Sequence, residues 1–233
     1  MNQEAPSIPF EQLPEADLCI GTVYRSGTAP SFGSDPISKL VGGGNRGGFR
    51  YKGKTAVPGL RFVVLFTTLN ESEWPDRFDR SGRQFIYYGD NRSPGQELHE
   101  TPKRGNLVLR EIFHAMHAGD RSSVPPILVF SRWRESRDVL FEGLAVPGSP
   151  ELDEEQDLTA FWKTHGDQRF LNYRAVFTML QVSTFARSDV EAMKSGSWLD
   201  VAPSPWSRWA QLGNLALGDL PPVPRPWLTT GAE

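Results

Sequence analysis

The chain of 233 residues contains a single cysteine, Cys19, so it can form no internal disulfide, and this composition is typical of a reducing compartment. Cys19 lies in the apolar run Leu18-Cys19-Ile20, which predicts a small core residue rather than a nucleophile. No stretch is apolar for long enough to cross a membrane, and the first residues, Met-Asn-Gln-Glu-Ala-Pro, lack the basic start and apolar centre of a signal peptide. We therefore expect a cytoplasmic protein with no membrane partner.

The common catalytic and metal-binding patterns are also missing from the sequence. No lysine follows Glu or Gln at the spacing of the usual metal-dependent nuclease, and there is no Gly-x-Ser-x-Gly or His-Glu-x-x-His pattern. His114 and His117 are three residues apart, but without further ligands a solvated or hydrogen-bonded pair is favoured over a metal site. We expect no catalytic residue, no metal and no cofactor, and therefore no enzymatic activity of this chain.

Charge is unevenly distributed along a chain whose formal net charge is only -3. Residues 36–70 contain no acid but hold six basic side chains, Lys39, Arg46, Arg50, Lys52, Lys54 and Arg61. Acids concentrate instead in residues 151–157. A basic surface on a nearly neutral domain indicates contact with a phosphate backbone, and the alternative is an ordinary solvated strip.

The pattern of apolar residues and the 19 prolines and 22 glycines predict one strand-rich α+β domain on a curved sheet or barrel. The clearest helix is 103–119, where Leu109, Ile112, Phe113 and Met116 follow helical spacing, and Asp35-Pro36 predicts a short helix to Leu40. Another short helix is expected from Ser188. Strands are expected at 17–24, 60–68, 84–89, 127–131, 139–146 and 170–186. Residues 1–16 are predicted to be an arm, 17–200 the domain, and 201–233 a Trp- and Pro-rich strap or linker.

Residues 42–48 carry five glycines in seven positions around Asn45 and Arg46, so neither a helix nor an ordinary strand is expected there. The loop lacks the Gly-Lys-Ser/Thr of a P-loop. It fits a flexible loop that carries Asn45 and Arg46 into a groove, or else a mobile linker.

The run Phe85-Ile86-Tyr87-Tyr88-Gly89-Asp90-Asn91-Arg92-Ser93-Pro94-Gly95 combines aromatic rings with an acid, an amide and an arginine. Such a set can hold a planar, hydrogen-bonding heterocycle, of which a nucleobase is the commonest example. The alternative is a strand that runs into a polar turn.

Four segments then occur in order at consistent spacing: 35–40, 44–50, 87–95 and 99–106. Together they resemble the N-terminal recognition domain of AspBHI-type modification-dependent restriction endonucleases, over about Ile8 to Phe185. The resemblance implies an SRA-like (PUA-like) fold, a curved β-barrel or sheet with flanking helices. It further implies binding of duplex DNA that contains 5-methylcytosine or 5-hydroxymethylcytosine, with the modified base flipped into a pocket.

For the pocket, the resemblance implies that Asp90 accepts a hydrogen bond from the exocyclic amine of cytosine, while Asn91 supports it or bonds the base carbonyl. Trp74 and Tyr88 are the expected stacking faces, with Tyr87 and Phe85 as alternatives. Neighbouring strand residues face opposite ways, so Tyr87 and Tyr88 should not both line the pocket. The expected DNA contacts are Asn45, Arg46, Arg50, Lys52, Lys54, Arg92, Lys103 and Arg104, with Lys103 and Arg104 close to a helix N-terminus.

In this family a nuclease domain follows the recognition domain, whereas this chain stops at Glu233. We therefore expect an excised domain or a free-standing reader that works with a partner nuclease. Two alternatives remain open, a nuclease or base-modifying enzyme with an unrecognised active site, and a reader of modified RNA.

Overall fold

The computed structural model describes residues 5–29, 32–42, 47–134, 136–218, 220–221 and 225. A mixed sheet has the strand order β4-β5-β8-β9-β11-β7-β6, with β3 paired to β1 and β9, and β10 paired to β11. Its strands are β1 (Ser7–Ile8), β3 (Val23–Tyr24), β4 (Phe49–Gly53), β5 (Leu60–Thr67), β6 (Arg77–Phe78), β7 (Gln84–Tyr88), β8 (Ile127–Arg132), β9 (Val139–Pro147), β10 (Leu158–His165) and β11 (Gln168–Met179). A small second sheet pairs β2 (Leu18–Cys19) with β12 (Thr184–Phe185).

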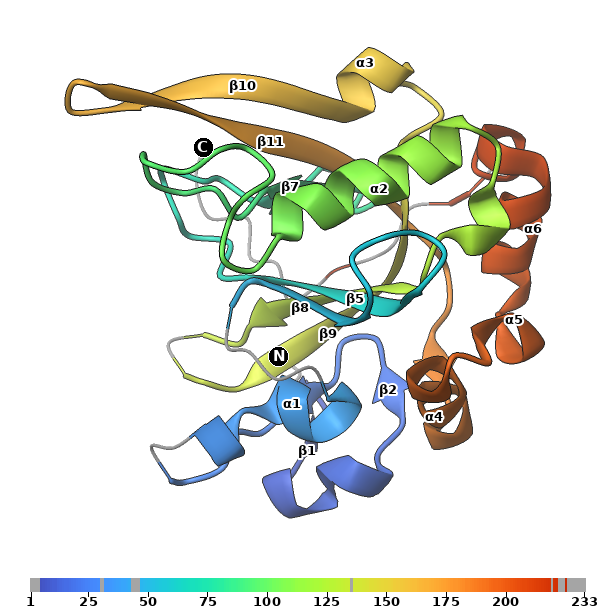
Figure 1. Cartoon of the computed structure of the whole chain (residues 1–233). Helices are drawn as coiled ribbons and strands as arrows, with labels where there is room; N and C mark the ends of the chain where they lie inside the picture. The colour runs from blue at the N-terminus through green and yellow to red at the C-terminus, as the bar shows by residue number, and fades with distance from the viewer. Residues whose placement is uncertain are drawn as a thin grey trace.

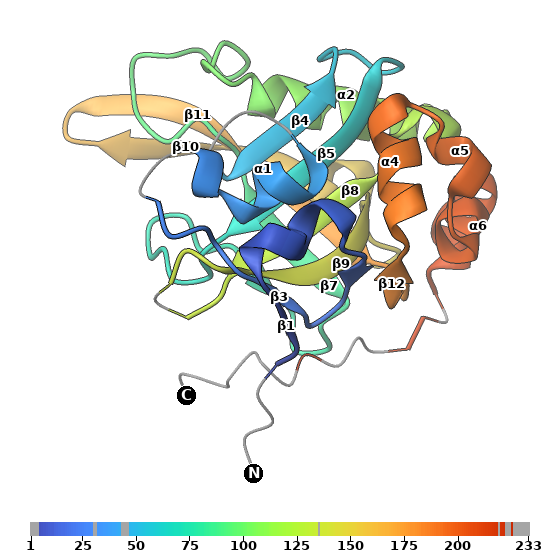
Figure 2. The same cartoon turned by 90° about the horizontal axis from the view of Figure 1, so that it is seen from below.

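The sheet lies on two sides of one central helix, α2 (Gly105–His117), with β10 and β11 above it and β5, β8 and β9 below it in Figure 1. Three further helices gather at one edge of the molecule, as both Figure 1 and Figure 2 show: α4 (Arg187–Ser195), α5 (Trp198–Val201) and α6 (Ser204–Leu212). The remaining helical segments are α1 (Pro36–Val41), α3 (Glu154–Asp157), η1 (Phe10–Glu15), η2 (Phe32–Ser34), η3 (Arg121–Ser123) and η4 (Gly213–Ala216). This arrangement confirms the prediction of an α+β fold with a large sheet.

Helix α2 confirms the helix predicted at 103–119. Its apolar side chains recur at helical spacing, and Leu109, Ile112 and Phe113 are fully or almost fully buried against the sheet. Gly119 has a φ of 81° just beyond the helix, a left-handed conformation that suits glycine. The N-terminus of α2 lies close to the end of β7, because the N–H groups of Gly105 and Asn106 donate to the Asp90 carboxylate.

Helix α1 also forms where Asp35-Pro36 predicted it. The Asp35 carboxylate accepts a hydrogen bond from the Ser38 backbone N–H at 3.1 Å, and Pro36 supplies the first helical residue. Strand β5, which was predicted at 60–68, is almost wholly buried between β4 and β8.

The structure adds detail to the sequence expectation, which described 1–16 as an arm and 201–233 as a strap or linker. Strands β4 and β10 form where no strand was predicted. The residues before Asp17 pack against the body of the domain, since Leu13 is fully buried and β1 pairs with β3. Trp206 and Trp209 of α6 are almost completely buried, so the described residues of 201–218 pack against the core as well.

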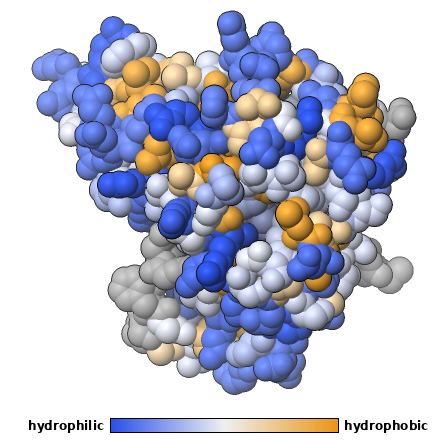
Figure 3. All heavy atoms as spheres, turned by 45° about the vertical axis from the view of Figure 1, so that its right-hand side comes forward, coloured by the Kyte–Doolittle hydropathy of each residue, from blue (hydrophilic) through white to orange (hydrophobic). Residues whose placement is uncertain are grey.

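The surface that Figure 3 brings forward is mainly hydrophilic, with hydrophobic side chains in separate spots. Large exposed hydrophobic residues on the C-terminal helical segments are Leu199, Leu212 and Leu215. Among the helices in the described part of the chain, none has the length and hydropathy that would let it span a membrane.

A buried ion pair ties Arg225 to the sheet. Arg225 Nη1 lies 3.1 Å from Glu142 Oε2 in β9, and the two side chains are 3% and 0% exposed. Glu142 Oε1 also accepts a hydrogen bond from the Ser131 hydroxyl at 2.7 Å, and the Arg225 guanidinium lies over the Phe78 ring. The pair therefore joins Arg225 to β9 and, through Ser131, to β8.

We predict that Glu142→Leu lowers the free energy of unfolding by about 3–5 kcal/mol, because it leaves a buried guanidinium without its counter-charge. Urea unfolding of Glu142→Leu, Arg225→Met and the double variant completes a double-mutant cycle. The double variant should lose less stability than the two single variants added together. Additive losses would show that the two charges do not interact.

Candidate functional site

A cavity of about 360 Å³ opens where the end of β7 meets the start of β4 and the loop before α2. Its lining residues are Gly48, Phe49, Tyr87, Asp90, Arg92, Pro102 and Lys103. The volume lies in the range of small-molecule sites, roughly 300–1,000 Å³. Two aromatic rings, a carboxylate and two cations around one cavity form a set that can hold a planar polar ligand.

A second cavity of about 460 Å³ lies near the turn between β8 and β9 and contains none of the predicted site residues. Arg25 and Asp138 line it and are paired with each other at 2.9 Å. The smaller cavity is the candidate site, because it gathers the aromatic, acidic and basic groups that the sequence singled out.

Asp90 holds the N-terminus of α2. Its Oδ2 accepts hydrogen bonds from the Thr101 hydroxyl at 2.7 Å and from the Gly105 N–H at 2.9 Å, and its Oδ1 accepts from the Asn106 N–H at 2.8 Å. A carboxylate has about four acceptor positions, so three protein donors leave roughly one for a ligand. Asp90 therefore caps the helix and lines the cavity with the same side chain.

The backbone next to Asp90 packs so closely that only glycine fits there. A Cβ on Gly89 would lie 1.8 Å from Asn106 Oδ1 and 2.6 Å from Asn172 Oδ1. Asn172, in β11, donates to the Gly89 carbonyl at 3.1 Å, and Asn106 Nδ2 donates to Asn172 Oδ1 at 3.0 Å. This asparagine pair fixes the end of β7 between α2 and β11.

The two tyrosines of β7 lie on opposite faces of the strand, as the alternation of strand side chains predicts. Tyr87 is 1% exposed and lines the cavity, and burial raises the pKa of its hydroxyl well above the usual value. Tyr88 instead lies beside Trp74, with ring centroids 6.2 Å apart. Phe161 and Phe170 also pack against Trp74, and the four rings form an aromatic cluster. Trp74 and Tyr88 therefore pack against other rings, and they are not among the residues that line the cavity.

Asn91 and Arg92 also form contacts within the protein. Asn91 is 2% exposed, and its Nδ2 donates to the carbonyl oxygens of Gln96 and Leu171. Arg92 lines the cavity and forms an ion pair with Glu71. Asn91 thus shapes the loop, whereas Arg92 keeps a charged group at the cavity wall.

Asp76 is a buried acid next to this region that the sequence analysis missed. It is 6% exposed, and its Oδ1 accepts a hydrogen bond from the Tyr88 N–H at 2.8 Å. Burial raises the pKa of Asp76 to about 7, although the Tyr88 N–H and the Arg92 charge act in the opposite direction. In the sequence, Asp76 stands directly after Trp74-Pro75, and this position does not show that the side chain is buried.

The structure separates the predicted basic contacts into distinct groups. Lys103 lines the cavity, with its Nζ against Gly47, where a Cβ would lie only 2.0 Å away. Arg104 is exposed just before α2, in a left-handed conformation with φ 52°. Asn45 and Arg46 lie outside the described residues.

Arg50 differs from the other cations because it is buried. Its side chain is only 4% exposed and pairs with Asp35, while its Nε donates to the Gly47 carbonyl. Arg50 therefore joins α1 to β4, and a phosphate cannot reach it there.

Lys52 and Lys54 are exposed, but they lie toward the other end of β4 from the cavity. Arg61, on the neighbouring strand, donates to the Lys194 carbonyl of α4 and marks that end of the hairpin. We call Arg92 and Lys103, which line the cavity, together with Arg104, the next residue in the chain, the cavity rim. Lys52 and Lys54 form a separate basic area.

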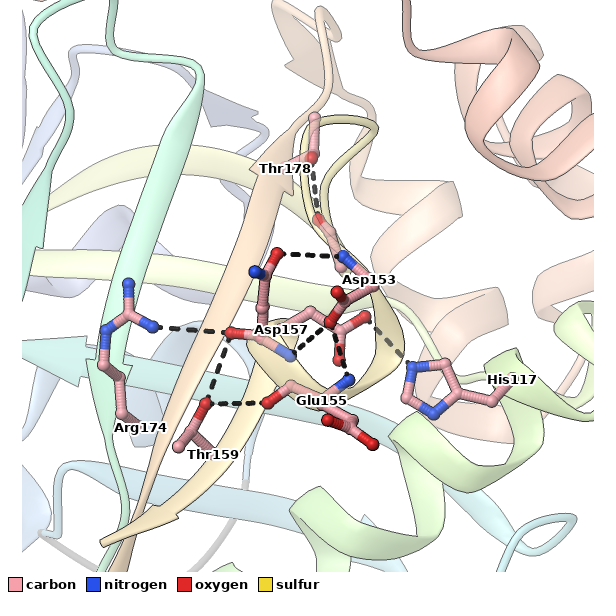
Figure 4. Close-up of polar contacts among 9 residues, drawn as sticks. His117, Asp153, Glu155, Asp157, Thr159, Arg174 and Thr178 are labelled. Carbon is pink, nitrogen blue, oxygen red and sulfur yellow. Dashed lines mark hydrogen bonds and ion pairs between the residues drawn. The ribbon is translucent and has the colours of Figure 1, made fainter.

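The acidic segment and His117 form a different cluster, shown in Figure 4. His117 Nε2 lies 3.0 Å from Asp157 Oδ2, and the Asp153 carboxylate caps α3 through the N–H groups of Glu155 and Gln156. Burial raises the pKa of Asp157, and its contact with His117 opposes this. His117 therefore joins the end of α2 to α3.

Comparisons with known proteins agree with each other on one family. The family model described as restriction endonuclease AspBHI N-terminal matches residues 18–218. Among solved structures, the DNA modification-dependent restriction endonuclease AspBHI is 44% identical with a TM-score of 0.84, and the match covers 94% of this chain and 56% of that one. The chain thus corresponds to only part of AspBHI. The comparison with curated proteins found no match.

Two further structures are similar over most of this chain. The DNA recognition domain of the cytosine modification-dependent restriction endonuclease LpnPI is 40% identical with a TM-score of 0.82, and the match covers 91% of this chain and 95% of that one. The MspJI restriction endonuclease in complex with a 27-mer oligonucleotide is 18% identical with a TM-score of 0.65, over 88% of this chain and 54% of that one, which supports the fold alone.

We predict that Gly89→Ala destabilises the domain by about 2 kcal/mol or more, since the new methyl group would overlap Asn106 and Asn172. Thermal unfolding measures the loss. Gly218→Ala is the matched control, because no described atom lies within 4 Å of a Cβ there. Similar melting temperatures for the two variants would contradict the close packing at Gly89.

We predict that Asp76→Asn makes stability less dependent on pH. The raised pKa of Asp76 means that the folded state holds a proton that the unfolded state releases between about pH 4 and pH 7. This group therefore makes the wild type less stable as pH rises through that window, by up to about 1.4 kcal/mol for each pH unit. Asp76→Asn should gain stability relative to wild type between pH 4 and pH 8.

Urea unfolding at several pH values tests this, with Asp167→Asn, an exposed turn acid, as the control. A stability difference between Asp76→Asn and wild type that stays constant with pH would show that Asp76 titrates normally.

Proposed function

The chain belongs to the restriction endonuclease AspBHI N-terminal family, and from this premise we propose that it binds duplex DNA at a modified cytosine that is flipped into the cavity beside Tyr87 and Asp90. The family part it matches is the DNA recognition domain of modification-dependent restriction endonucleases and not their catalytic part. The finer proposal, which covers base flipping and 5-methylcytosine or 5-hydroxymethylcytosine as the ligand, rests on the geometry of the cavity.

One observation carries this proposal: Asp90 keeps about one acceptor position while its other positions are bound by the protein. The exocyclic amine of cytosine is a donor, whereas thymine presents a carbonyl at the same position. An acceptor whose direction is fixed by a helix N-terminus therefore selects cytosine. Tyr87 lines the cavity next to Asp90, with only 1% of the residue exposed.

The free energy that a base gains in the cavity is similar in size to the cost of flipping it out of the duplex. Taking a base out of the duplex costs a few kcal/mol of pairing and stacking. An aromatic contact returns on the order of 1–3 kcal/mol per base. Because these terms are similar, the hydrogen bond at Asp90 and contacts at the C5 substituent decide whether a given base stays in the cavity.

We assign the phosphate contacts to the cavity rim. Arg92, Lys103 and Arg104 lie beside the first residues of α2, whose N-terminus adds a favourable field for an anion. Lys52 and Lys54 can contact only DNA that extends along β4. Arg50 is not part of the proposed surface, because its charge is neutralised by Asp35.

The SRA-like character of the fold and a partner nuclease remain parts of this proposal. The sheet on two sides of α2 supports the first. AspBHI itself is longer than the matched region, which supports the second. We propose that this domain directs cleavage by a nuclease domain or partner and does not cleave DNA itself.

We predict that wild type binds a duplex with one 5-methylcytosine or 5-hydroxymethylcytosine more tightly than the unmodified duplex in mobility-shift titrations. Asp90→Ala should reduce that preference by about tenfold or more, since each good base contact is worth about 1–3 kcal/mol. Loss of the helix cap also lowers stability, so the readout is the ratio of affinities within one preparation, in which the folded fraction cancels. An unchanged ratio would contradict the pocket assignment.

We predict that Lys103→Ala weakens binding to modified and unmodified duplexes equally and reduces the slope of log affinity against log salt by about one. Lys54→Ala is the matched control at the far end of β4, and its affinity should remain closer to that of wild type. Loss of affinity only for the modified duplex would show that Lys103 contacts the base rather than a phosphate.

A further inference from the structure

Strands β10 and β11 extend beyond the rest of the sheet as a two-stranded ribbon. Their pairing runs from Leu158↔Ala175 to His165↔Gln168, whereas the pairing of β11 with β7 begins only at Arg174. Figure 1 shows the ribbon projecting past the body, on the same side as the loop before α2, and Figure 2 shows the same projection from below. Residues 159–173 therefore form an arm with no third strand beside it in the described part of the chain.

One face of the ribbon anchors it to the domain. Phe161 and Phe170 pack against Trp74, with ring centroids 6.3 Å and 6.2 Å away. Lys163 Nζ lies 4.0 Å from the centroid of the Trp74 ring and donates to the Glu73 carbonyl. This face is therefore occupied by contacts within the protein.

The opposite face carries an exposed aromatic and a cation that contact each other. Trp162 is 58% exposed, and the Arg169 guanidinium carbon lies 4.8 Å from its ring centroid. Stacking on the indole holds the guanidinium in one plane, which reduces the entropy lost when it binds a phosphate. The pair is thus preformed for a contact with a flat, anionic partner.

The base of the ribbon is bonded to the cavity loop. Asn91 Nδ2 donates to the Leu171 carbonyl at 2.9 Å, and the Gly89 N–H donates to the Tyr173 carbonyl at 2.9 Å. Gly89 and Asn91 flank Asp90 in the chain, so the ribbon and the cavity acid hold a fixed relative position. A partner seated at the cavity therefore meets the ribbon at a defined distance.

Charge is polarised along the ribbon. The end nearest the body follows the acids of α3, while the outer end carries His165 and Arg169 with one acid, Asp167. Arg169 lies on the same face of β11 as Ala175, which pairs with the cavity residue Tyr87, so its charge is on the cavity side of the sheet. This shared face and the exposed cation beside an aromatic ring favour duplex DNA as the occupant.

We propose that the β10–β11 ribbon is a second DNA contact, in which Trp162 and Arg169 lie against the sugar-phosphate backbone of the duplex on one side of the modified base. The inference rests on the proposed function and adds a contact outside the cavity. A two-stranded ribbon has the width that the major groove admits. At about 3.3 Å per residue, the free part of β11 extends roughly 20 Å, or about six base pairs of duplex.

The test uses mobility shifts of the full chain with Trp162→Ala and Arg169→Gln. Two duplexes of about 16 base pairs are compared. In one, the modified cytosine lies about three base pairs from the 5′ end of its strand, and in the other it lies about three base pairs from the 3′ end, so that only one of them has DNA that reaches the ribbon. Each variant should bind that duplex about threefold to tenfold more weakly and bind the other duplex like wild type. Arg169→Gln should also lower the salt dependence for the first duplex only.

Arg80→Gln is the matched control, because Arg80 is exposed and lies far from the ribbon. It belongs to the turn that ends at Arg83, and the Arg83 carbonyl accepts a hydrogen bond from the Met179 N–H at the opposite end of β11. Wild-type affinity of both ribbon variants for both duplexes, or equal losses on both, would overturn the inference. Failure of the proposed function gives a different result, in which wild type does not distinguish modified from unmodified duplex.

Discussion

The carboxylate of Asp90 is the interaction on which the rest of the site depends. It binds the first two N–H groups of α2 and the Thr101 hydroxyl, so the end of β7, the loop and the helix form one rigid unit. The helix N-terminus stabilises the negative charge, and that charge caps the helix. The geometry at the cavity thus follows from helix capping, and any ligand that uses the last acceptor position of Asp90 meets a group that cannot rotate away.

Neighbouring side chains of β7 face opposite sides of the sheet and form two different surfaces. Tyr87 faces the cavity, and the next residue, Tyr88, faces Trp74 and the ring cluster that anchors the ribbon. A shift of one residue in the pairing of β7 with β11 would exchange these faces and destroy both surfaces. The Gly89 contact with Asn106 and Asn172 opposes such a shift, because only the observed register places glycine at that point. The packing of one glycine therefore protects the cavity and the ribbon together.

The sequence predicted α2 and the buried β5 from the pattern of their apolar residues, because that pattern reports burial directly, and it predicted α1 from the helix start signal of Asp35-Pro36. It missed β4 and β10, since Phe49–Gly53 follows a glycine-rich loop and Leu158–His165 follows an acidic segment. It also predicted Arg50 as a phosphate contact, although Arg50 is buried against Asp35. Basic residues look alike in a sequence whether they face solvent or a carboxylate, and Asp76 escaped notice because its burial arises from segments distant in the chain. The resemblance to a known family gave the functional class, which single residues could not.

A chain with a net charge of -3 can still favour DNA, because binding depends on the local field and not on the total. Acids of residues 151–157 are largely engaged within the protein: Asp157 pairs with His117, Asp153 caps α3, and Glu151 bonds Ser149 and Gln84. The cations at the cavity rim stand on the loop before α2, on another part of the surface. At physiological salt, charges are screened over about 8 Å, so acids that lie farther away than this repel the DNA backbone only weakly. In the proposed function, this segregation of charge lets a domain that is acidic overall attract phosphates at the cavity rim, while the cavity acid selects the base.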